Sequence, residues 1–131
     1  MTVGQITNEL KNNLKMILPG RINKMILYGS YARKEASSDS DIDILVICNG
    51  VVDSQLREQI YNECYKINSL YDVWIDISLL SQDDLKTIRG KQPYIQNALY
   101  EGITLWLTKI NKSPSLPFPK GRAFLKLGRG I

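Results

Sequence analysis

The apolar residues of the chain fall into segments of two kinds, and their alternation limits the possible folds most strongly. Leu10, Leu14 and Ile17 repeat at the spacing of one helix face, and the Pro-Gly pair that follows predicts the end of this helix. Short apolar runs over 24–28 and 41–48 predict two strands, because turn residues bound each run. Helices and strands that alternate along one chain favour a sheet covered by helices.

The second half of the chain continues this alternation. Asp53 is a good N-cap for a second long helix, which Asn68 and Ser69 are expected to close. Apolar and polar residues alternate over 73–79, which predicts a third strand with one apolar face. The remaining predicted elements are a short helix capped by Ser81, a helix from Pro93 to about Gly102, and a strand over 103–107. The expected fold class is therefore α/β (α+β), with helices flanking a small sheet.

The length and the termini restrict the class of protein. The 131 residues fit one domain, and no apolar run approaches the ~18 residues that a membrane span requires. The first residues, MTVGQITNEL, contain neither the basic nor the apolar part of a secretory signal. We therefore expect a cytoplasmic protein that does not span a membrane.

The net charge of +4 comes from the end of the chain. Residues 109–131 contain six basic and no acidic residues, whereas residues 1–108 have a net charge of −2. We therefore expect no direct nucleic-acid binding by the core. We expect one domain over 1–110, followed over 111–131 by a basic tail with three prolines and three glycines. That tail is interpreted as disordered or left over from cloning, with a partner-binding arm as the alternative.

Histidine is absent, which excludes catalysis by Ser-His-Asp or Cys-His sites and zinc sites that use histidine. Cys48 and Cys64 lie in apolar segments without a second cysteine nearby, and they are interpreted as reduced, packed thiols. The chemistry left to this chain is that of carboxylates, hydroxyl groups, lysine or a metal ion.

One motif combines these groups: Gly29-Ser30, ten further residues, and then Asp41-Ile42-Asp43. Gly29 allows the backbone to approach a phosphate closely, and Ser30 is placed where a strand leads into a helical turn with free amide groups. Asp41 and Asp43 are two positions apart on a strand, so they project from the same face. Two carboxylates ~5 Å apart repel by about 3 kcal/mol at an effective dielectric of about 20, which a hard cation such as Mg²⁺ would relieve.

Asp76 is the expected third acid, because it lies in the middle of the 73–79 strand on the polar face. Asp72 shares that face but lies at the strand edge, where an aspartate usually forms a turn. Asp76 is therefore preferred. Three carboxylates that share two metal ions are the arrangement that two-metal phosphoryl transfer requires.

The run GSYARKEASSDSDIDILV resembles the GS-x10-DxD signature of the polymerase-beta-like nucleotidyltransferase superfamily, and specifically the minimal nucleotidyltransferases, or MNT proteins. The resemblance covers roughly residues 7–108 and implies a small mixed sheet flanked by helices. It also implies transfer of a nucleoside monophosphate from an NTP, usually ATP, with release of pyrophosphate. Family members commonly read Ala-Arg-Gly after the GS-x; here Arg33 matches, and Lys34 replaces the glycine.

The resemblance also implies a role for each site residue. Gly29 and Ser30 would hold the triphosphate, with Arg33 as a further nucleotide-binding residue. Asp41 and Asp43 would hold two Mg²⁺ ions, and Asp76 would be the third ligand and the general base. MNT proteins are often encoded beside a HEPN-domain partner, as the antitoxin that adenylylates and silences an RNase toxin.

Two other functions remain open from the sequence. The acceptor of the nucleotide could be a small molecule such as an aminoglycoside, with a homodimer completing the cleft. The chain could also be a non-catalytic antitoxin that acts by binding alone, although a binding protein has no need for a pair of carboxylates that repel each other.

Overall fold

The computed structural model describes residues 2–37, 39–87 and 91–107. Its elements in chain order are α1 (Val3–Ile17), β1 (Ile22–Tyr28), β2 (Ile42–Cys48), α2 (Ser54–Tyr71), β3 (Ile75–Ser81), the 3-10 helix η1 (Asp83–Lys86), α3 (Pro93–Glu101) and β4 (Ile103–Leu107). The predicted tail over 111–131 and the domain boundary at 110 lie outside the described residues, so both stay predictions.

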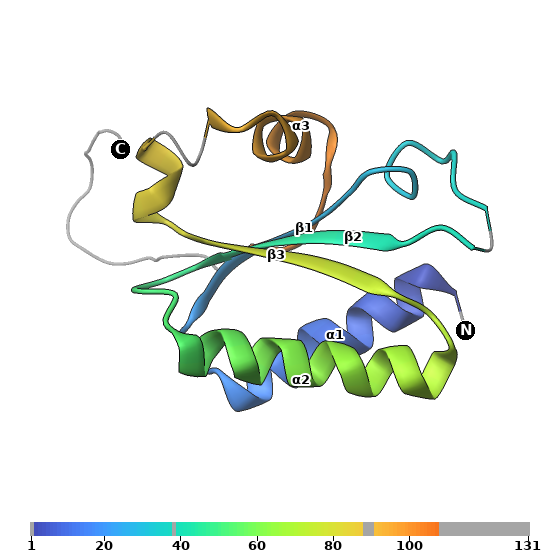
Figure 1. The fold of residues 1–131 in the computed structure, drawn as a ribbon, viewed down its shortest axis with the longest axis horizontal. Helices are drawn as coiled ribbons and strands as arrows, with labels where there is room; N and C mark the ends of the chain where they lie inside the picture. Colours follow the sequence, from blue (N-terminus) through green and yellow to red (C-terminus); the bar gives the residue numbers. More distant parts are fainter. Residues whose placement is uncertain (1, 38, 88–90, 108–131) are drawn as a thin grey trace, which may run out of the picture.

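The four strands form one mixed sheet in the order β3-β2-β1-β4. β2 and β3 are parallel, whereas β1 pairs antiparallel with both β2 and β4. Helices α1 and α2 lie against one face of the sheet, and α3 lies against the other (Figure 1). This arrangement confirms the predicted α+β class with a small mixed sheet flanked by helices.

The core has two layers, one on each face of the sheet. The larger cluster joins α1 and α2 to one face, and the even-numbered residues of β2 from Ile42 to Cys48 belong to it. The smaller cluster lies under α3 and includes Leu45 and Ile47 from the opposite face of the same strand. The residues of β2 after Asp43 are all apolar, because a central strand that is covered on both faces needs apolar side chains on both faces.

The helix starts agree with the sequence signals. The Asp53 side chain accepts a hydrogen bond from the Leu56 amide at 2.8 Å, which confirms the predicted N-cap of α2. The Ser81 hydroxyl accepts from the Asp84 amide at 3.0 Å, as its predicted capping role requires, although the element that follows is a short 3-10 helix. Pro93 is in the first turn of α3, as predicted. In the described residues, no helix is long and apolar enough to cross a membrane.

Three predicted boundaries are wrong by two or three residues. β1 begins at Ile22, two residues before the apolar run, and α2 continues past Asn68 and Ser69 to Tyr71. The helix ends there because Asp72 adopts the left-handed conformation, with φ of 54°. β3 begins at Ile75, two residues after the start of its alternating pattern, because its pairing with β2 begins at the Ile42–Ile75 pair.

The two cysteines are free thiols in the core, as predicted. Burial raises the pKa of Cys48 to about 11 and that of Cys64 to about 12. Both thiols therefore stay protonated at neutral pH, which excludes them as nucleophiles.

Candidate active site

The candidate site lies at the end of the sheet where β1 ends and where β2 and β3 begin (Figure 1). Asp43 on β2 and Asp76 on β3 are partners in the parallel register. Asp43 lies between Ile42 and Ile44, whose side chains belong to the core under α1 and α2. Alternation along the strand therefore places Asp43 on the opposite face, the one that α3 covers in part.

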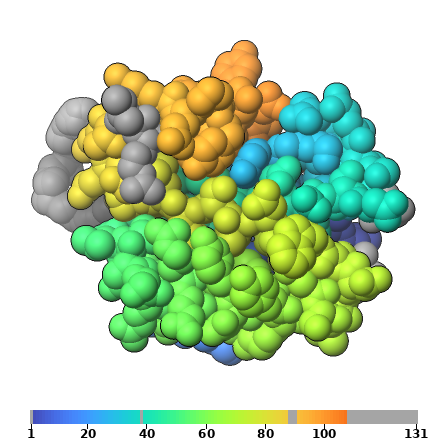
Figure 2. All heavy atoms as spheres, viewed as in Figure 1, coloured from blue at the N-terminus to red at the C-terminus, as the bar shows by residue number. Residues whose placement is uncertain are grey.

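Asp76 is exposed, because β3 is an edge strand and α3 does not cover its beginning. In the space-filling view, β3 (yellow) forms part of the surface between α2 (green) and α3 (orange) (Figure 2). Solvent and a second molecule therefore have access to the Asp76 carboxylate.

The sequence predicts a strand that begins at Asp41, but β2 begins at Ile42. Asp41 therefore lies directly before the strand. It lines an open cavity of about 310 Å³ together with Tyr31 and Trp74. Trp74 is 54% exposed, so it is a surface residue of this cavity and not a core residue.

The carboxylates influence one another electrostatically. Burial raises the pKa of Asp43, the charges of Asp76 and Asp41 raise it further, and the positive charge of Arg33 opposes this rise. Asp41, Asp76 and Arg33 therefore all lie close enough to Asp43 to influence its charge. Their roles in catalysis or binding stay a prediction.

Gly29 lies directly against Asp43. A Cβ atom at position 29 would overlap with the Asp43 carboxylate, and Gly29 adopts φ of 75°. Both facts require glycine, because other residues rarely adopt this conformation and all of them carry a Cβ. Glycine here therefore allows the Asp43 carboxylate to lie directly against the backbone of the turn.

Residues 30–33 after Gly29 form a single helical turn and not a helix. The Glu35 amide donates to the Ser30 carbonyl at 2.8 Å, and the Lys34 amide donates to the Tyr31 carbonyl at 3.3 Å. This pair of bonds is the Schellman motif that closes a helix, and Lys34 occupies its left-handed position with φ of 61°. One turn is too short for a helix dipole to matter, so any phosphate binding at Ser30 depends on its hydroxyl and on local amides.

Arg33 is held by two acids in this structure. Its guanidinium pairs with Glu35 at 2.9 Å and with Glu101, the last residue of α3, at 3.4 Å. Hydrogen bonds to these carboxylates raise the pKa of Arg33. The predicted nucleotide-binding arginine is thus engaged with protein acids through two of its nitrogen atoms, and these acids would compete with a triphosphate for its charge.

Two further residues of this face were not anticipated from the sequence. The Tyr28 hydroxyl lies 3.5 Å from the Ser78 hydroxyl, so the Tyr28 side chain spans from β1 across β2 to β3. Burial raises the pKa of Tyr28, and the charges of Asp43 and Asp76 contribute to this rise. Tyr28 is the register partner of Asp43, but a single sequence does not reveal which strands pair.

The comparison with known proteins decides the family. A family model described as "Polymerase beta, Nucleotidyltransferase" matches residues 5–110. The chain belongs to this nucleotidyltransferase family. One relative is a protein of Methanocaldococcus jannaschii that is named as a protein adenylyltransferase by inference. It is 36% identical over 98 residues, which are 75% of this chain and 92% of that protein.

Solved structures share the nucleotidyltransferase fold. A crystal structure of a toxin-antitoxin with AMP-PNP has a TM-score of 0.56 and 24% identity, and it covers 82% of this chain and 76% of its own. A tri-AMPylated Shewanella oneidensis HEPN toxin in complex with an MNT antitoxin has a TM-score of 0.51 and 24% identity, covering 81% of this chain and 74% of its own. At these identities the likeness shows the shared fold alone.

The donor atoms of this nucleotidyltransferase fit a hard cation. Asp41, Asp43 and Asp76 offer carboxylate oxygens, the ligands that Mg²⁺ prefers. Burial and the charges of Asp76 and Asp41 raise the pKa of Asp43, and a bound cation would oppose this rise. In the described parts of the chain, no three His, Cys, Asp or Glu side chains are arranged to hold one ion. Binding through all three carboxylates would therefore require at least one of them to change its conformation.

Replacing Lys34 by Gly is expected to stabilise this nucleotidyltransferase by about 0.5–1 kcal/mol. Lys34 occupies a left-handed position that costs a residue with a Cβ roughly 1 kcal/mol or more, and glycine avoids this cost. Urea unfolding measures the change. Lys34→Ala is the matched control, because it removes the same charge but keeps the Cβ. An equal gain for both variants would show that charge, and not backbone conformation, is responsible.

Replacing Glu101 by Gln is expected to lower the KM for the nucleotide substrate about two- to threefold with little change in kcat. An exposed ion pair contributes at most about 1 kcal/mol, so its loss makes Arg33 modestly more available to the triphosphate. Steady-state kinetics separate the two parameters. Glu58→Gln, at an exposed position of α2, is the control. An unchanged or higher KM would contradict a role of Arg33 in nucleotide binding.

Proposed function

We propose that this chain is a Mg²⁺-dependent protein adenylyltransferase that moves AMP from ATP to a hydroxyl group of a HEPN-domain partner, as an antitoxin that silences an RNase toxin. The observation that carries the proposal is the row of Asp43 and Asp76 beside the Gly29-Ser30 turn, with Asp41 next to it. Membership of the nucleotidyltransferase family supports the reaction class. The inferred activity of the relative supports a protein acceptor.

The three carboxylates would hold the metal ions. Asp41, Asp43 and Asp76 would bind two Mg²⁺ ions, which when bound neutralise the triphosphate and favour ionisation of the attacking hydroxyl. Asp43 has the strongest need for a counter-ion, because burial and two like charges raise its pKa. Asp76 is exposed at the sheet edge, as Asp41 is directly before β2, so a hydroxyl of another molecule can reach its carboxylate.

The remaining residues would position the nucleotide. The Ser30 hydroxyl and the amides of its turn would bind phosphate oxygens, and Gly29 keeps the turn against Asp43. The acceptor oxygen then bonds to the α-phosphorus, its proton passes to the Asp76 carboxylate, and pyrophosphate leaves. The products are pyrophosphate and an acceptor that carries AMP.

A protein acceptor agrees with the open form of the site. Asp76 lies on an edge strand, and the cavity beside Asp41 exposes Trp74 to the surface. In-line attack requires that a hydroxyl is held at a fixed angle to the α-phosphate. A folded partner that docks on this surface would present a tyrosine, serine or threonine hydroxyl in that way.

The proposal is tested by the mass of the partner after reaction. The chain is incubated with ATP, Mg²⁺ and a HEPN-domain protein from the same organism, and both proteins are weighed by intact mass spectrometry. We expect the partner to gain the mass of one or more adenylyl groups, in proportion to time and enzyme. Modification of an aminoglycoside alone would favour a small-molecule acceptor instead. An unmodified partner that the Asp43→Asn variant still silences would favour a non-catalytic antitoxin.

A further inference from the structure

β4 is an edge strand with an exposed outer side. It pairs with β1, and within the described residues no strand lies on its other side. Ile103 is 45% exposed and Leu107 is 56% exposed. An edge of this kind presents a row of backbone N–H and C=O groups to which a further extended segment can add.

A bulge turns part of β4 toward α1. The register pairs Met25 with Trp106 and Ile26 with Thr104, which leaves Leu105 without a partner on β1. Because of this extra residue, the neighbours Leu105 and Trp106 both pack against the core under α1. On the face toward α1, the side chains of Leu105 and Trp106 partly cover the strand. The backbone edge of β4 that points away from β1 is open within the described residues.

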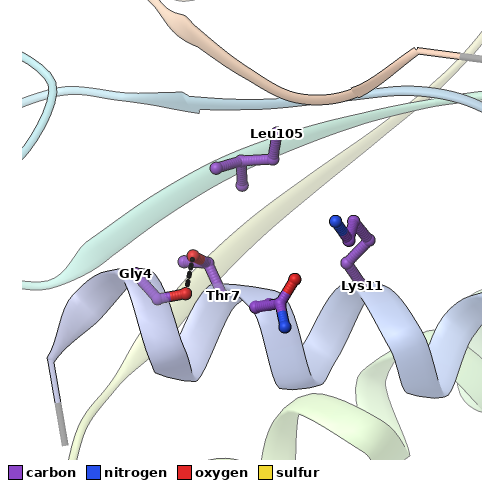
Figure 3. A pocket seen from close by; sticks show the side chains of 5 residues that line it. Gly4, Thr7, Lys11 and Leu105 are labelled. Atoms are coloured by element: carbon purple, nitrogen blue, oxygen red, sulfur yellow. Dashed lines mark hydrogen bonds between the residues drawn. The ribbon is translucent and has the colours of Figure 1, made fainter.

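A small pocket of about 140 Å³ lies between α1 and this edge. Figure 3 shows its lining: Gly4, Thr7, Asn8 and Lys11 from one stripe of α1, and Leu105 from β4. The Lys11 side chain rises from the helix toward the strands (Figure 3). One turn further along the same stripe, the Lys15 ammonium lies 5.2 Å from the centre of the Trp106 ring.

The charge along this edge is positive. Lys11 and Lys15 are the charged residues of the α1 stripe that faces β4. The acid of α1, Glu9, accepts a hydrogen bond from the Tyr71 hydroxyl of α2, so it is engaged away from β4. The acid of α3, Glu101, pairs with Arg33. β4 itself contains no charged residue.

We propose that the β4 edge binds an extended, acidic segment of a partner protein as a fifth strand of the sheet. The backbone of the segment would pair with β4, and its acidic side chains on the α1 side would meet Lys11 and Lys15. The segment would also contact Ile103 on the α1 side and would cover Leu107 on the opposite side. This surface is formed by elements other than the Asp41, Asp43 and Asp76 site, and the proposal does not depend on the transfer reaction.

Two segments of this protein could in principle pair with the β4 edge: the β4 strand of a second copy and residues 109–131. Positive charge argues against both of them. A second copy added antiparallel to β4 would place its own α1 on the same face, so that lysines of both copies would approach one another. Lysines beside an edge strand are a known means of preventing such self-pairing. Residues 109–131 carry six basic and no acidic residues, so they also fail to complement Lys11 and Lys15.

The test uses the full chain and three synthetic peptides in isothermal titration calorimetry. The first peptide is an eight-residue alternation of Glu and Val, the second has Lys in place of Glu, and the third is the first with alternate backbone nitrogens methylated. We expect measurable binding of the first peptide and at least tenfold weaker binding of the other two. Equal binding of the methylated peptide would overturn strand addition, and no binding of the first at millimolar concentration would overturn the proposal.

Variants locate the binding. The double substitution Lys11→Glu with Lys15→Glu is expected to weaken binding of the acidic peptide at least tenfold, and Lys11→Gln with Lys15→Gln at least threefold. Lys86→Glu, in η1 next to the opposite edge strand β3, makes the same Lys-to-Glu change at one position away from β4 and should leave binding within twofold. Circular dichroism verifies that each variant is folded. Unchanged binding by both double variants, or a dimer in sedimentation that the acidic peptide dissociates, would overturn the proposal.

Discussion

Replacement of Asp43 by Asn will lower the rate of adenylyl transfer at least about 1,000-fold, which corresponds to roughly 4 kcal/mol of transition-state stabilisation. The carboxylate lies in register with Asp76 and against Gly29, so its charge is central to any cation bound there. Asn keeps the size of the side chain and removes this charge. The measurement is the initial rate of AMP incorporation into the partner at saturating ATP and Mg²⁺.

The same variant is expected to be more stable than the wild type, although its transfer rate is lower. The pKa of Asp43 is raised in the folded state, so its ionisation opposes folding at pH values above the ordinary pKa of 3.8. The melting temperature of Asp43→Asn without metal should therefore exceed that of the wild type at pH 7, and the difference should vanish as the pH falls below that pKa. Asp83→Asn, at an exposed position of η1, is the control for both measurements. Wild-type turnover by Asp43→Asn would contradict the metal-site interpretation.

Replacement of Gly29 by Ala will lower adenylyl transfer about 100-fold and destabilise the fold by roughly 1–2 kcal/mol. The added Cβ would overlap with the Asp43 carboxylate, so that carboxylate must leave its position beside the turn. The backbone cost arises because φ at this position is 75°, where alanine is disfavoured. Initial rates and urea unfolding measure the two effects separately.

Gly20→Ala is a matched control for this substitution. Gly20 has φ of 77°, and a Cβ there would meet no atom within 4 Å. The control therefore carries the same backbone cost without the contact to Asp43, and its transfer rate should stay within twofold of the wild type. Equal losses of activity in both variants would show that the Asp43 contact is not the cause.

The positions of Asp43 and Asp76 follow from patterns that a single sequence contains. Alternation along a strand specifies the face of a side chain, and it predicts that Asp76 lies opposite the apolar residues of its own strand. The family resemblance then supplies the expected roles. The parallel register that makes these two residues neighbours comes from the structure.

Sequence patterns do not predict contacts between residues that are distant in the chain. Glu101 pairs with Arg33 over 68 positions, and Tyr28 reaches Ser78 over 50 positions. The start of β3 differs from its alternating pattern for a similar reason: pairing with β2 begins only at the Ile42–Ile75 pair, and hydropathy patterns do not record which residues pair. Such contacts depend on which elements pack together, which a period of 2 or 3.6 does not specify.

The transfer of labelled phosphate from ATP tests the central claim most directly. The chain, Mg²⁺ and the HEPN-domain partner are incubated in parallel with ATP labelled at the α-phosphate and with ATP labelled at the γ-phosphate. A nucleotidyltransferase attaches the α-label covalently to the partner and releases the γ-label in pyrophosphate. We predict α-label on the partner with the wild type, and none with Asp41→Asn, Asp43→Asn or Asp76→Asn. Covalent γ-label, or α-label that persists in all three variants, would contradict the account.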